Sequence, residues 1–148
     1  MQKMILETRV KSKNNIPTRA NPTDAGLDLR ANTSAFIGKS RVMVGTGVSV
    51  KIPVGYVGLL VARSSLSKKD LVLSNSIGII DSDYRGELKV ALTYIGSGLG
   101  ENIEEGDRIA QLLVVPIALP LVNLNMDTEE EWCDTDRGAG GFGSTGVK

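Results

Sequence analysis

Residues 88–94 read LKVALTY, and apolar side chains alternate with other types along this stretch. One face would carry Leu88, Val90, Leu92 and Tyr94, and the other face Lys89, Ala91 and Thr93. Because successive side chains of a β-strand point to opposite faces, this period of two predicts a half-buried strand. VSVKI at 48–52 has the same period and predicts a second strand of this kind.

Two longer apolar runs predict strands that are covered on both faces, YVGLLVA at 56–62 and IAQLLVVPI at 109–117. Turn-forming Gly, Pro and Asp residues separate the runs, so we predict an all-β sandwich or barrel of short strands. At most one short helix is expected, of one or two turns around SSLSKKD at 64–70, with Ser64 or Ser65 as its cap.

The bulk composition limits the partners of the chain. Its 148 residues suit one domain with a single core, and 17 glycines indicate many turns. Seventeen basic and seventeen acidic residues cancel without any basic run, which argues against nucleic acid and against an anionic membrane surface as partners. No apolar stretch reaches the roughly 20 residues of a membrane span or resembles a signal peptide. We therefore expect a cytoplasmic protein, in agreement with the single Cys133, which cannot form an internal disulfide.

Composition also divides the chain into three parts. We expect a single all-β domain over 1–126, an acidic linker over 127–136 and a glycine-rich C-terminal arm over 137–148. A Gly/Ser-rich terminus is typically flexible. RGAGGFGSTG at 137–146 nevertheless carries an arginine and a phenylalanine, so its bare backbone N–H groups could cradle a polyphosphate while the ring lies against a flat base.

The chain has no histidine, and this absence limits its chemistry. Histidine-based triads and histidine-ligated zinc are excluded. Any hydrolysis would have to use carboxylates, hydroxyls, arginines and a hard metal bound through oxygen.

ARSSL at 62–66 places Arg63, Ser64 and Ser65 directly after a predicted buried strand. A guanidinium fork, hydroxyls and the free N–H groups of a helix start suit a phosphate chain. Taken alone, the pattern is more often a solvated strand end with a serine cap.

NSIGIIDSDYRG at 75–86 ends an apolar run in two acids that flank a serine. An Asp-rich hairpin turn would explain this pattern without any function. Asp81, however, would stand at the mouth of the sheet, where a carboxylate can receive a proton from water.

Two further segments carry polar side chains next to predicted strands. DAGLDLRA at 24–31 holds Asp24 and Asp28, a pair that could support Mg²⁺ through bound waters, although each acid taken singly suits turn chemistry better. In GDRIAQ at 106–111, Gln111 falls inside an apolar strand. Its amide needs a hydrogen-bond partner there, because an unsatisfied buried amide costs roughly 1–3 kcal/mol.

In order along the chain, five segments resemble the five motifs of the trimeric dUTPase family. They are DAGLDL, RSSL, NSIGIIDSDYRG, GDRIAQ and RGAGGFGSTG. Any single motif could arise by chance, whereas five in the family's order with near-family spacing form a specific signal. The resemblance covers the chain from about residue 15 to residue 146. It implies jelly-roll-like, distorted-barrel subunits in a homotrimer, with active sites at subunit interfaces.

The resemblance also implies an enzyme that uses Mg²⁺ to hydrolyse dUTP to dUMP and pyrophosphate. Such an activity limits uracil in DNA and supplies dUMP for thymidylate synthesis. Asp81 matches the aspartate that activates the water attacking the α-phosphorus. Asp28 would act near the metal, through water, or in the supporting polar network, and Arg108 matches a structural arginine.

The substrate contacts implied by the resemblance fall into three groups. The phosphate group comprises Arg63, Ser64, Ser65 and Gln111; the base and sugar group comprises Asn75, Gly78, Ile80 and Tyr84; the arm group comprises Arg137, Phe142, Gly143, Ser144 and Thr145. In the second group, Tyr84 would lie under the deoxyribose and leave no room for a 2′-hydroxyl. In the arm, the ring would cover uracil and the polar residues would close on the γ-phosphate.

The sequence departs from the family pattern at three places. Ser65 stands where the family commonly has glycine, which hinders close approach of the backbone to phosphate but adds a hydroxyl. The loop 67–70 is about one residue short, and the acidic linker is a few residues long.

Two other functions fit parts of the sequence. The dCTP deaminases share the fold and an RSS segment, but they carry a catalytic glutamate at the position that aligns with Ala91. A non-enzymatic binding module of the same fold would be expected to lose Asp81 or the arm, and this chain retains both.

Overall fold

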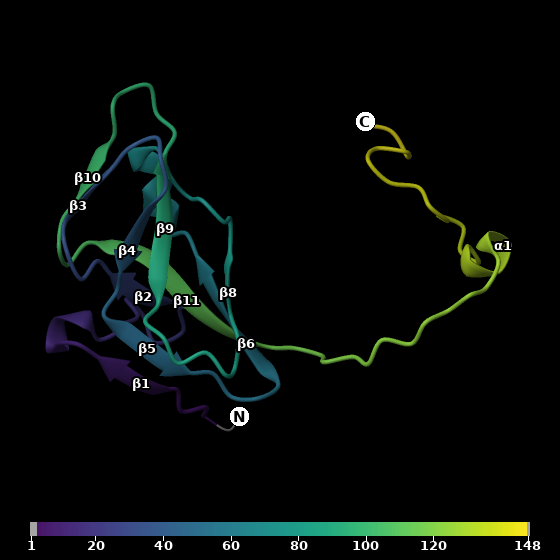
Figure 1. Cartoon of the computed structure of the whole chain (residues 1–148), viewed down its shortest axis with the longest axis horizontal. Coiled ribbons are helices and arrows are strands. Elements are labelled where there is room, and N and C mark those ends of the chain that lie inside the picture. Colours follow the sequence, from purple (N-terminus) through teal and green to yellow (C-terminus); the bar gives the residue numbers. More distant parts are fainter. Residues whose placement is uncertain (1–2, 148) are drawn as a thin grey trace. The chain divides into compact units, whose positions relative to one another are not determined.

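Residues 3–147, which the computed structural model describes, form eleven strands, two short 3₁₀ helices and one turn of α-helix (Figure 1). The strands are β1 (Glu7–Val10), β2 (Leu27–Arg30), β3 (Ala35–Ile37), β4 (Val42–Gly45), β5 (Val48–Lys51), β6 (Tyr56–Val61), β7 (Leu71–Leu73), β8 (Gly78–Ile80), β9 (Lys89–Tyr94), β10 (Glu101–Ile103) and β11 (Arg108–Pro116). The helices are η1 (Lys13–Asn15), η2 (Ser64–Lys69) and α1 (Glu129–Trp132). The all-β prediction is confirmed.

All strand pairings among the described residues are antiparallel. The largest sheet has the order β2-β11-β6-β8, and a three-stranded sheet has the order β4-β9-β7. Strand β1 pairs with β5, and β3 pairs with β10. The four strands expected from hydrophobic patterning are present as β5, β6, β9 and β11.

One hydrophobic core unites the two larger sheets. Leu29 and Ile109 from the four-stranded sheet and Val90 and Leu92 from the three-stranded sheet are fully buried and belong to the same cluster. Burying an aliphatic side chain of this size contributes about 1.5–3 kcal/mol. Ala91, expected on the polar face of its strand, is only 6% exposed, because β9 is the central strand of its sheet.

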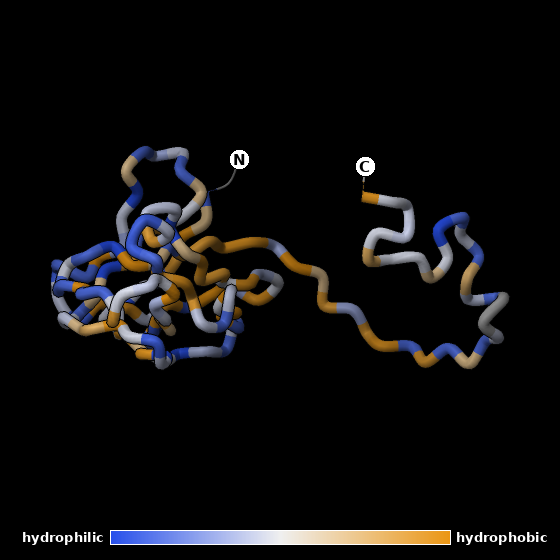
Figure 2. The backbone as a smooth tube through the Cα atoms, turned by 90° about the horizontal axis from the view of Figure 1, so that it is seen from above, coloured by the Kyte–Doolittle hydropathy of each residue, from blue (hydrophilic) through white to orange (hydrophobic). Residues whose placement is uncertain are grey.

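The chain divides into two compact units, residues 1–118 and 119–148. The first unit contains every strand. The second contains α1 and the turns of the arm, and it begins with a mainly hydrophobic stretch that Figure 2 shows in orange after β11.

The single turn α1 lies inside the segment expected to be an acidic linker, and it was not predicted. Thr128 and Glu131 form a capping box: the Thr128 N–H donates to Glu131 Oε2 (3.1 Å), and the Glu131 N–H donates to Thr128 Oγ1 (3.3 Å). The hydrogen bonds from the Thr128 backbone and then its side chain lower the pKa of Glu131. The local signal was the sequence TEEE, because Thr followed three residues later by Glu is typical of a helix start.

Within the described residues, no helix has the length and apolar character needed to cross a bilayer.

Candidate active site

The first cluster of candidate residues forms where β6 ends and η2 begins. Arg63 has extended backbone geometry (φ −86°, ψ 148°) and precedes the first helical residue, Ser64. The expectation that Ser64 or Ser65 caps the helix is wrong, because both lie inside it and no side chain caps it. The Ser65 hydroxyl instead accepts a hydrogen bond from Arg63 Nη1 at 3.0 Å.

Asp28 anchors this cluster from the neighbouring part of the sheet. Its Oδ1 accepts a hydrogen bond from Arg63 Nε at 2.8 Å, and its Oδ2 lies 3.5 Å from Arg108 Nη1. The Asp28 side chain is only 12% exposed, so the ion pairs compensate the cost of placing a carboxylate there. Asp28 thus joins Arg63 to Arg108, for which a structural role stays a prediction from the resemblance.

Strand register explains why these residues meet. Gln111, in the central strand β11, lies opposite Asp28 in β2 on one side and opposite Val61 in β6 on the other. The hydrogen-bond partner that its amide needs is the Ala62 carbonyl, which accepts from Gln111 Nε2 at 3.0 Å. The backbone ladders thus bring three distant sequence segments to one place.

Gly26 also shapes this cluster, although the sequence reasoning did not single it out. A Cβ at residue 26 would lie 2.2 Å from Gln111 Oε1 and 3.0 Å from Gln111 Cβ. Only glycine therefore leaves the glutamine side chain in place. The signal was the glycine of the DAG turn beside a strand that carries a polar side chain.

A cavity of about 210 Å³ adjoins the cluster, and most of its polar lining is cationic. Its lining residues are Arg63, Ser65, Leu66, Lys69, Ile103, Asp107 and Arg108. Three cations against Asp107 of the lining and the adjoining Asp28 leave a net positive charge, which favours an anionic ligand at this edge of the sheet.

The second cluster lies on β8 and the loop that follows it. Asn75 is exposed in the turn before β8. Its side chain lies next to Gly78: if residue 78 had a Cβ, that atom would be 3.7 Å from Asn75 Nδ2. Gly78 is buried against Leu60. A larger residue does not fit there, because a Cβ at residue 78 would lie only 2.9 Å from the Leu60 Cβ. Ile80 ends the strand and pairs with Gly58 of β6.

The loop after β8 presents a carboxylate and a ring. Asp81 is exposed, and its carboxylate has no hydrogen-bond partner within the described part of the chain. The Tyr84 hydroxyl donates to the Glu87 carbonyl at 2.9 Å, and its ring lies over Gly86, where a Cβ would come within 2.5 Å of that hydroxyl. Tyr84 is therefore held in place, and Gly86 is a second supporting glycine that the sequence reasoning missed.

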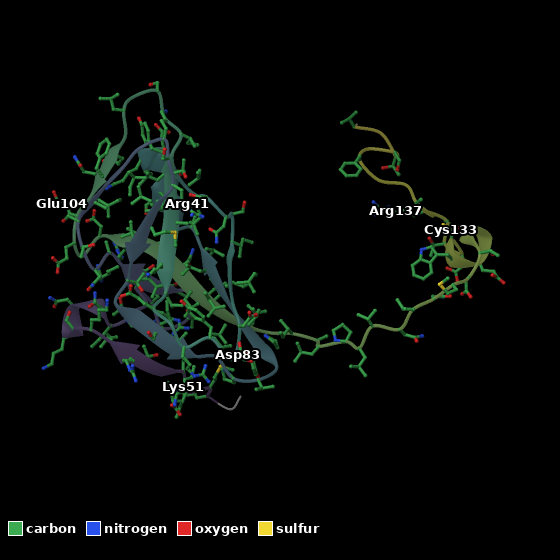
Figure 3. All side chains as sticks on the ribbon, in the orientation of Figure 1. Arg41, Lys51, Asp83, Glu104, Cys133 and Arg137 are labelled. Carbon is green, nitrogen blue, oxygen red and sulfur yellow. The ribbon has the colours of Figure 1, made fainter. Side chains whose placement is uncertain are left out.

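Only the Asp81 end of the second cluster lies away from Arg63 along β6, because Gly78 pairs with Leu60 and Ser76 lines a cavity together with Arg63 and Ser64. Ile80, next to Asp81, pairs with Gly58, whereas Arg63 follows five residues after that glycine. At about 3.3 Å per residue, this separation is about 16 Å. Figure 3 labels Asp83, which belongs to the same loop after β8 as Asp81.

The two acids of the DAGLDLRA segment, Asp24 and Asp28, have different partners. The Asp24 carboxylate accepts hydrogen bonds from Asn21 in its own turn, whereas Asp28 is paired with the two arginines. Asp24 is therefore a turn residue. Across the described residues, no group of three or more acidic, cysteine or histidine side chains could hold a metal ion.

The candidate residues of the arm lie in turns of the second unit. Arg137 Nε donates to the Gly140 carbonyl at 2.9 Å, and Phe142 adopts a left-handed backbone (φ 49°) with its ring fully exposed. Gly143 also has positive φ (82°), while Ser144 and Thr145 are exposed.

A comparison with known sequences decides the family. The dUTPase family model matches residues 12–146. The chain belongs to the dUTPase family. Within it, the deoxyuridine 5′-triphosphate nucleotidohydrolase of Rhodococcus erythropolis is 44% identical over 133 residues, covering 88% of this chain and 79% of that protein. The enzyme of the same name from Escherichia phage T5 is 42% identical over 142 residues, covering 90% and 93%.

Solved dUTPases share the fold. The dUTPase of Staphylococcus bacteriophage 80alpha, solved with dUPNHPP, is 32% identical with a TM-score of 0.81, and the match covers 98% of this chain and 100% of that one. A variant of the dUTPase from phage phi11 of S. aureus, whose structure details the coordination of a structural Mg(II) ion, is 30% identical with a TM-score of 0.75; the match covers 85% and 99%. This dUTPase-family chain has buried Ala91 where deamination would need a carboxylate.

Proposed function

We propose that this protein hydrolyses dUTP to dUMP and pyrophosphate by attack of water on the α-phosphorus, with Mg²⁺ as cofactor. The activity would limit uracil in DNA and supply dUMP for thymidylate synthesis. The observation that carries the proposal is the combination of a guanidinium-rich cluster at Arg63 with the exposed, unpaired carboxylate of Asp81, in a chain of the dUTPase family.

The cluster at the end of β6 would bind the phosphate chain. Arg63 keeps N–H groups available beyond those used by Asp28 and Ser65, and the exposed Ser64 adds a hydroxyl and a backbone N–H at the start of η2. Gln111 is held beside them by the Ala62 carbonyl. These groups would stabilise negative charge on the β- and γ-phosphates.

The hairpin around β8 would recognise base and sugar. Asn75 and the backbone groups of Gly78 and Ile80 lie along one hairpin, which suits hydrogen bonding to the polar edge of uracil. Tyr84 is fixed at its hydroxyl, so its ring can act as a rigid floor under deoxyribose and exclude a 2′-hydroxyl.

Asp81 would act as the general base. As its carboxylate takes a proton from the attacking water, the water oxygen forms a bond to the α-phosphorus and the bond from that phosphorus to the bridging oxygen breaks. Pyrophosphate leaves with the bonding electrons, and dUMP remains. General-base assistance of this kind typically contributes 10²–10⁴-fold to the rate.

Mg²⁺ fits this site as an ion carried mainly by the substrate phosphates. Mg²⁺ commonly uses one or two carboxylates, several waters and phosphate oxygens. Asp28 accepts from two arginines, but each carboxylate oxygen can accept a further bond, so Asp28 could contact the ion through water. When bound, the ion would neutralise charge on the phosphates.

The position of Asp81 relative to Arg63 supports sites shared between copies of the chain. Within one chain, about 16 Å of β6 backbone lies between Gly58, which pairs with Ile80 beside Asp81, and Arg63, and the exposed Asp81 carboxylate contacts no residue of the Arg63 cluster among the described residues. We therefore propose a homotrimer in which one copy supplies Asp81 and another supplies Arg63. The arm, with Arg137, Phe142, Gly143, Ser144 and Thr145, would close over the bound nucleotide.

The test is release of pyrophosphate from dUTP, dTTP, dCTP and UTP, each with and without Mg²⁺. We expect release from dUTP that depends on Mg²⁺ and much less from the other nucleotides. The Asp81→Asn variant should still bind the imido analogue dUpNHpp but turn over at least 100-fold more slowly. Ammonia release from dCTP, or near-normal turnover by Asp81→Asn, would contradict the proposal.

A further inference from the structure

Ser65 has a contact that the phosphate-binding role alone does not explain. Its hydroxyl accepts a hydrogen bond from Arg63 Nη1 at 3.0 Å, within the short helix η2 that follows the arginine. We infer that Ser65 is a positioning residue, which fixes the Arg63 guanidinium for the phosphate chain of the substrate. This inference rests on the proposed function, and it assigns a specific task to the side chain at this position.

The guanidinium is held from two different elements. Asp28 of β2 binds Nε at 2.8 Å, and Ser65 of η2 binds Nη1. A single bond at Nε allows the guanidinium plane to pivot about that hydrogen bond, whereas a second bond at Nη1 fixes the plane. Rotation about the Cζ–Nε bond, which exchanges Nη1 with Nη2, also requires the bond at Nη1 to break. Nη2 has no protein partner within the described residues, so the fixed group presents it to an anion.

The second anchor matters because the first one is shared. Asp28 also faces Arg108, whose Nη1 lies 3.5 Å from Oδ2. A carboxylate between two guanidinium groups can shift toward either one, so Asp28 alone does not define the Arg63 orientation. The Arg63 side chain is 21% exposed, and solvent would compete for Nη1 if the serine hydroxyl were absent.

Fixing the Arg63 guanidinium before the substrate arrives should affect substrate affinity more than the rate of the chemical step. The charge that Arg63 would contact on the β- and γ-phosphates is present before and during the reaction, so loss of its orientation weakens ground state and transition state alike. The ordinary net contribution of a solvent-exposed hydrogen bond such as this one corresponds to roughly a three- to tenfold change in affinity. We therefore expect KM for dUTP to rise while kcat stays nearly constant.

The direct test measures the rate at which the Arg63 guanidinium rotates. We would obtain this rate from the ¹⁵N NMR signals of its Nη atoms in the full-length protein without substrate. Ser65→Ala should accelerate rotation about Cζ–Nε, and Ser65→Thr, which restores a hydroxyl, should return it to the wild-type rate. Ser67→Ala is the matched control, because Ser67 Oγ donates to the Ser64 carbonyl and does not contact the guanidinium. Equal rotation rates in wild type and Ser65→Ala would overturn the inference.

A second measurement tests the effect on function by comparing the affinity for dUpNHpp with the affinity for dUMP. Ser65→Ala should weaken dUpNHpp binding and raise KM for dUTP roughly three- to tenfold, with dUMP binding unchanged. In an Arg63→Lys background, which lacks Nη1, the same substitution should have no further effect. An equal loss in that background would overturn the inference. A wild-type protein inactive on dUTP would refute the proposed function, while the rotation measurement would still test the contact.

Discussion

At the residue scale, the candidate site depends on a few side chains held by backbone and by each other. Asp28 joins Arg63 to Arg108, Gln111 is tied to the Ala62 carbonyl, and Tyr84 is tied to the Glu87 carbonyl. Each bond restricts a side chain before any ligand arrives, which lowers the entropy cost of binding. Asp81 differs from them, because its carboxylate remains exposed and unpaired within the described residues.

Tyr84 gives a prediction at this scale. Tyr84→Ala removes the ring that we place under the sugar, so the preference for dUTP over UTP, measured as the ratio of kcat/KM values, should fall roughly ten- to hundredfold. Tyr84→Phe is the matched control, because it keeps the ring and loses only the bond to the Glu87 carbonyl. We expect Tyr84→Phe to retain most of the preference; an unchanged ratio in Tyr84→Ala would mean that another group excludes the 2′-hydroxyl.

At the scale of elements, the pairing of β11 with β2 and with β6 brings together the residues of the Arg63 cluster. Asp28 and Val61 flank Gln111 in register, and Arg63 follows two residues after the valine. A slip of one residue in either ladder would turn the polar side chains to the other face of the sheet. The buried apolar residues of these strands oppose such a slip.

Gly26 tests this arrangement. Gly26→Ala would place a Cβ 2.2 Å from Gln111 Oε1 and 3.0 Å from Gln111 Cβ, so the glutamine side chain must turn away from its present position and from the Ala62 carbonyl. We expect a loss of about 1–3 kcal/mol in the free energy of unfolding, measured with urea, together with a higher KM for dUTP.

Gly38→Ala provides the control for that measurement. A Cβ at residue 38 would meet its nearest neighbours, the Leu99 carbonyl and the Phe36 ring, at an ordinary 3.7 Å. Its unfolding free energy and KM should stay close to wild type. If Gly26→Ala behaved in the same way, the close packing of Gly26 on Gln111 would not matter for the site.

At the scale of the whole molecule, the position of Asp81 after β8 favours a site shared between copies of the chain. About 16 Å of β6 backbone lies between Gly58, which pairs with Ile80 beside Asp81, and Arg63, and sheet pairing fixes this strand. The proposed homotrimer requires that the Asp81 end of one copy meets the Arg63 end of another.

Mixing two inactive variants tests this requirement. We would unfold and refold Asp81→Asn together with Arg63→Ala in equal amounts and measure pyrophosphate release from dUTP. With random assembly, a site that draws its two residues from different copies has both intact in about a quarter of cases, so about a quarter of wild-type activity should return. Sites contained in single chains would regain none, and each variant refolded alone gives the baseline.

The arm gives a second prediction at this scale. Every residue of the hydrophobic core lies within 1–118, so removal of residues 137–148 should leave the midpoint of thermal unfolding nearly unchanged. Without the arm, kcat/KM for dUTP should fall at least tenfold, as expected when a closing segment is lost. A chain lacking only residues 147–148 is the control. Unfolding of the longer truncation at ordinary temperature would show that the arm supports the fold.

Local sequence was sufficient for the fold class, and it also named the individual site candidates, whose roles stay predictions. Alternation of apolar residues predicted β5 and β9, and apolar runs predicted β6 and β11, because side-chain period and strand composition are local properties. The same reasoning missed α1 and assigned the wrong cap to η2, since a few residues of helix depend on hydrogen bonds that weak propensities do not settle.

The sequence by itself determined the fold class, several of the strands and the polar residues that follow them. Only the tertiary structure decided which of those residues meet. Asp28 pairs with Arg63 across 35 positions of sequence and with Arg108 across a still longer interval, and both contacts depend on strand register. The same register keeps Asp81 at the far end of β6. Register is set by packing of the whole core, a long-range property that no short segment encodes.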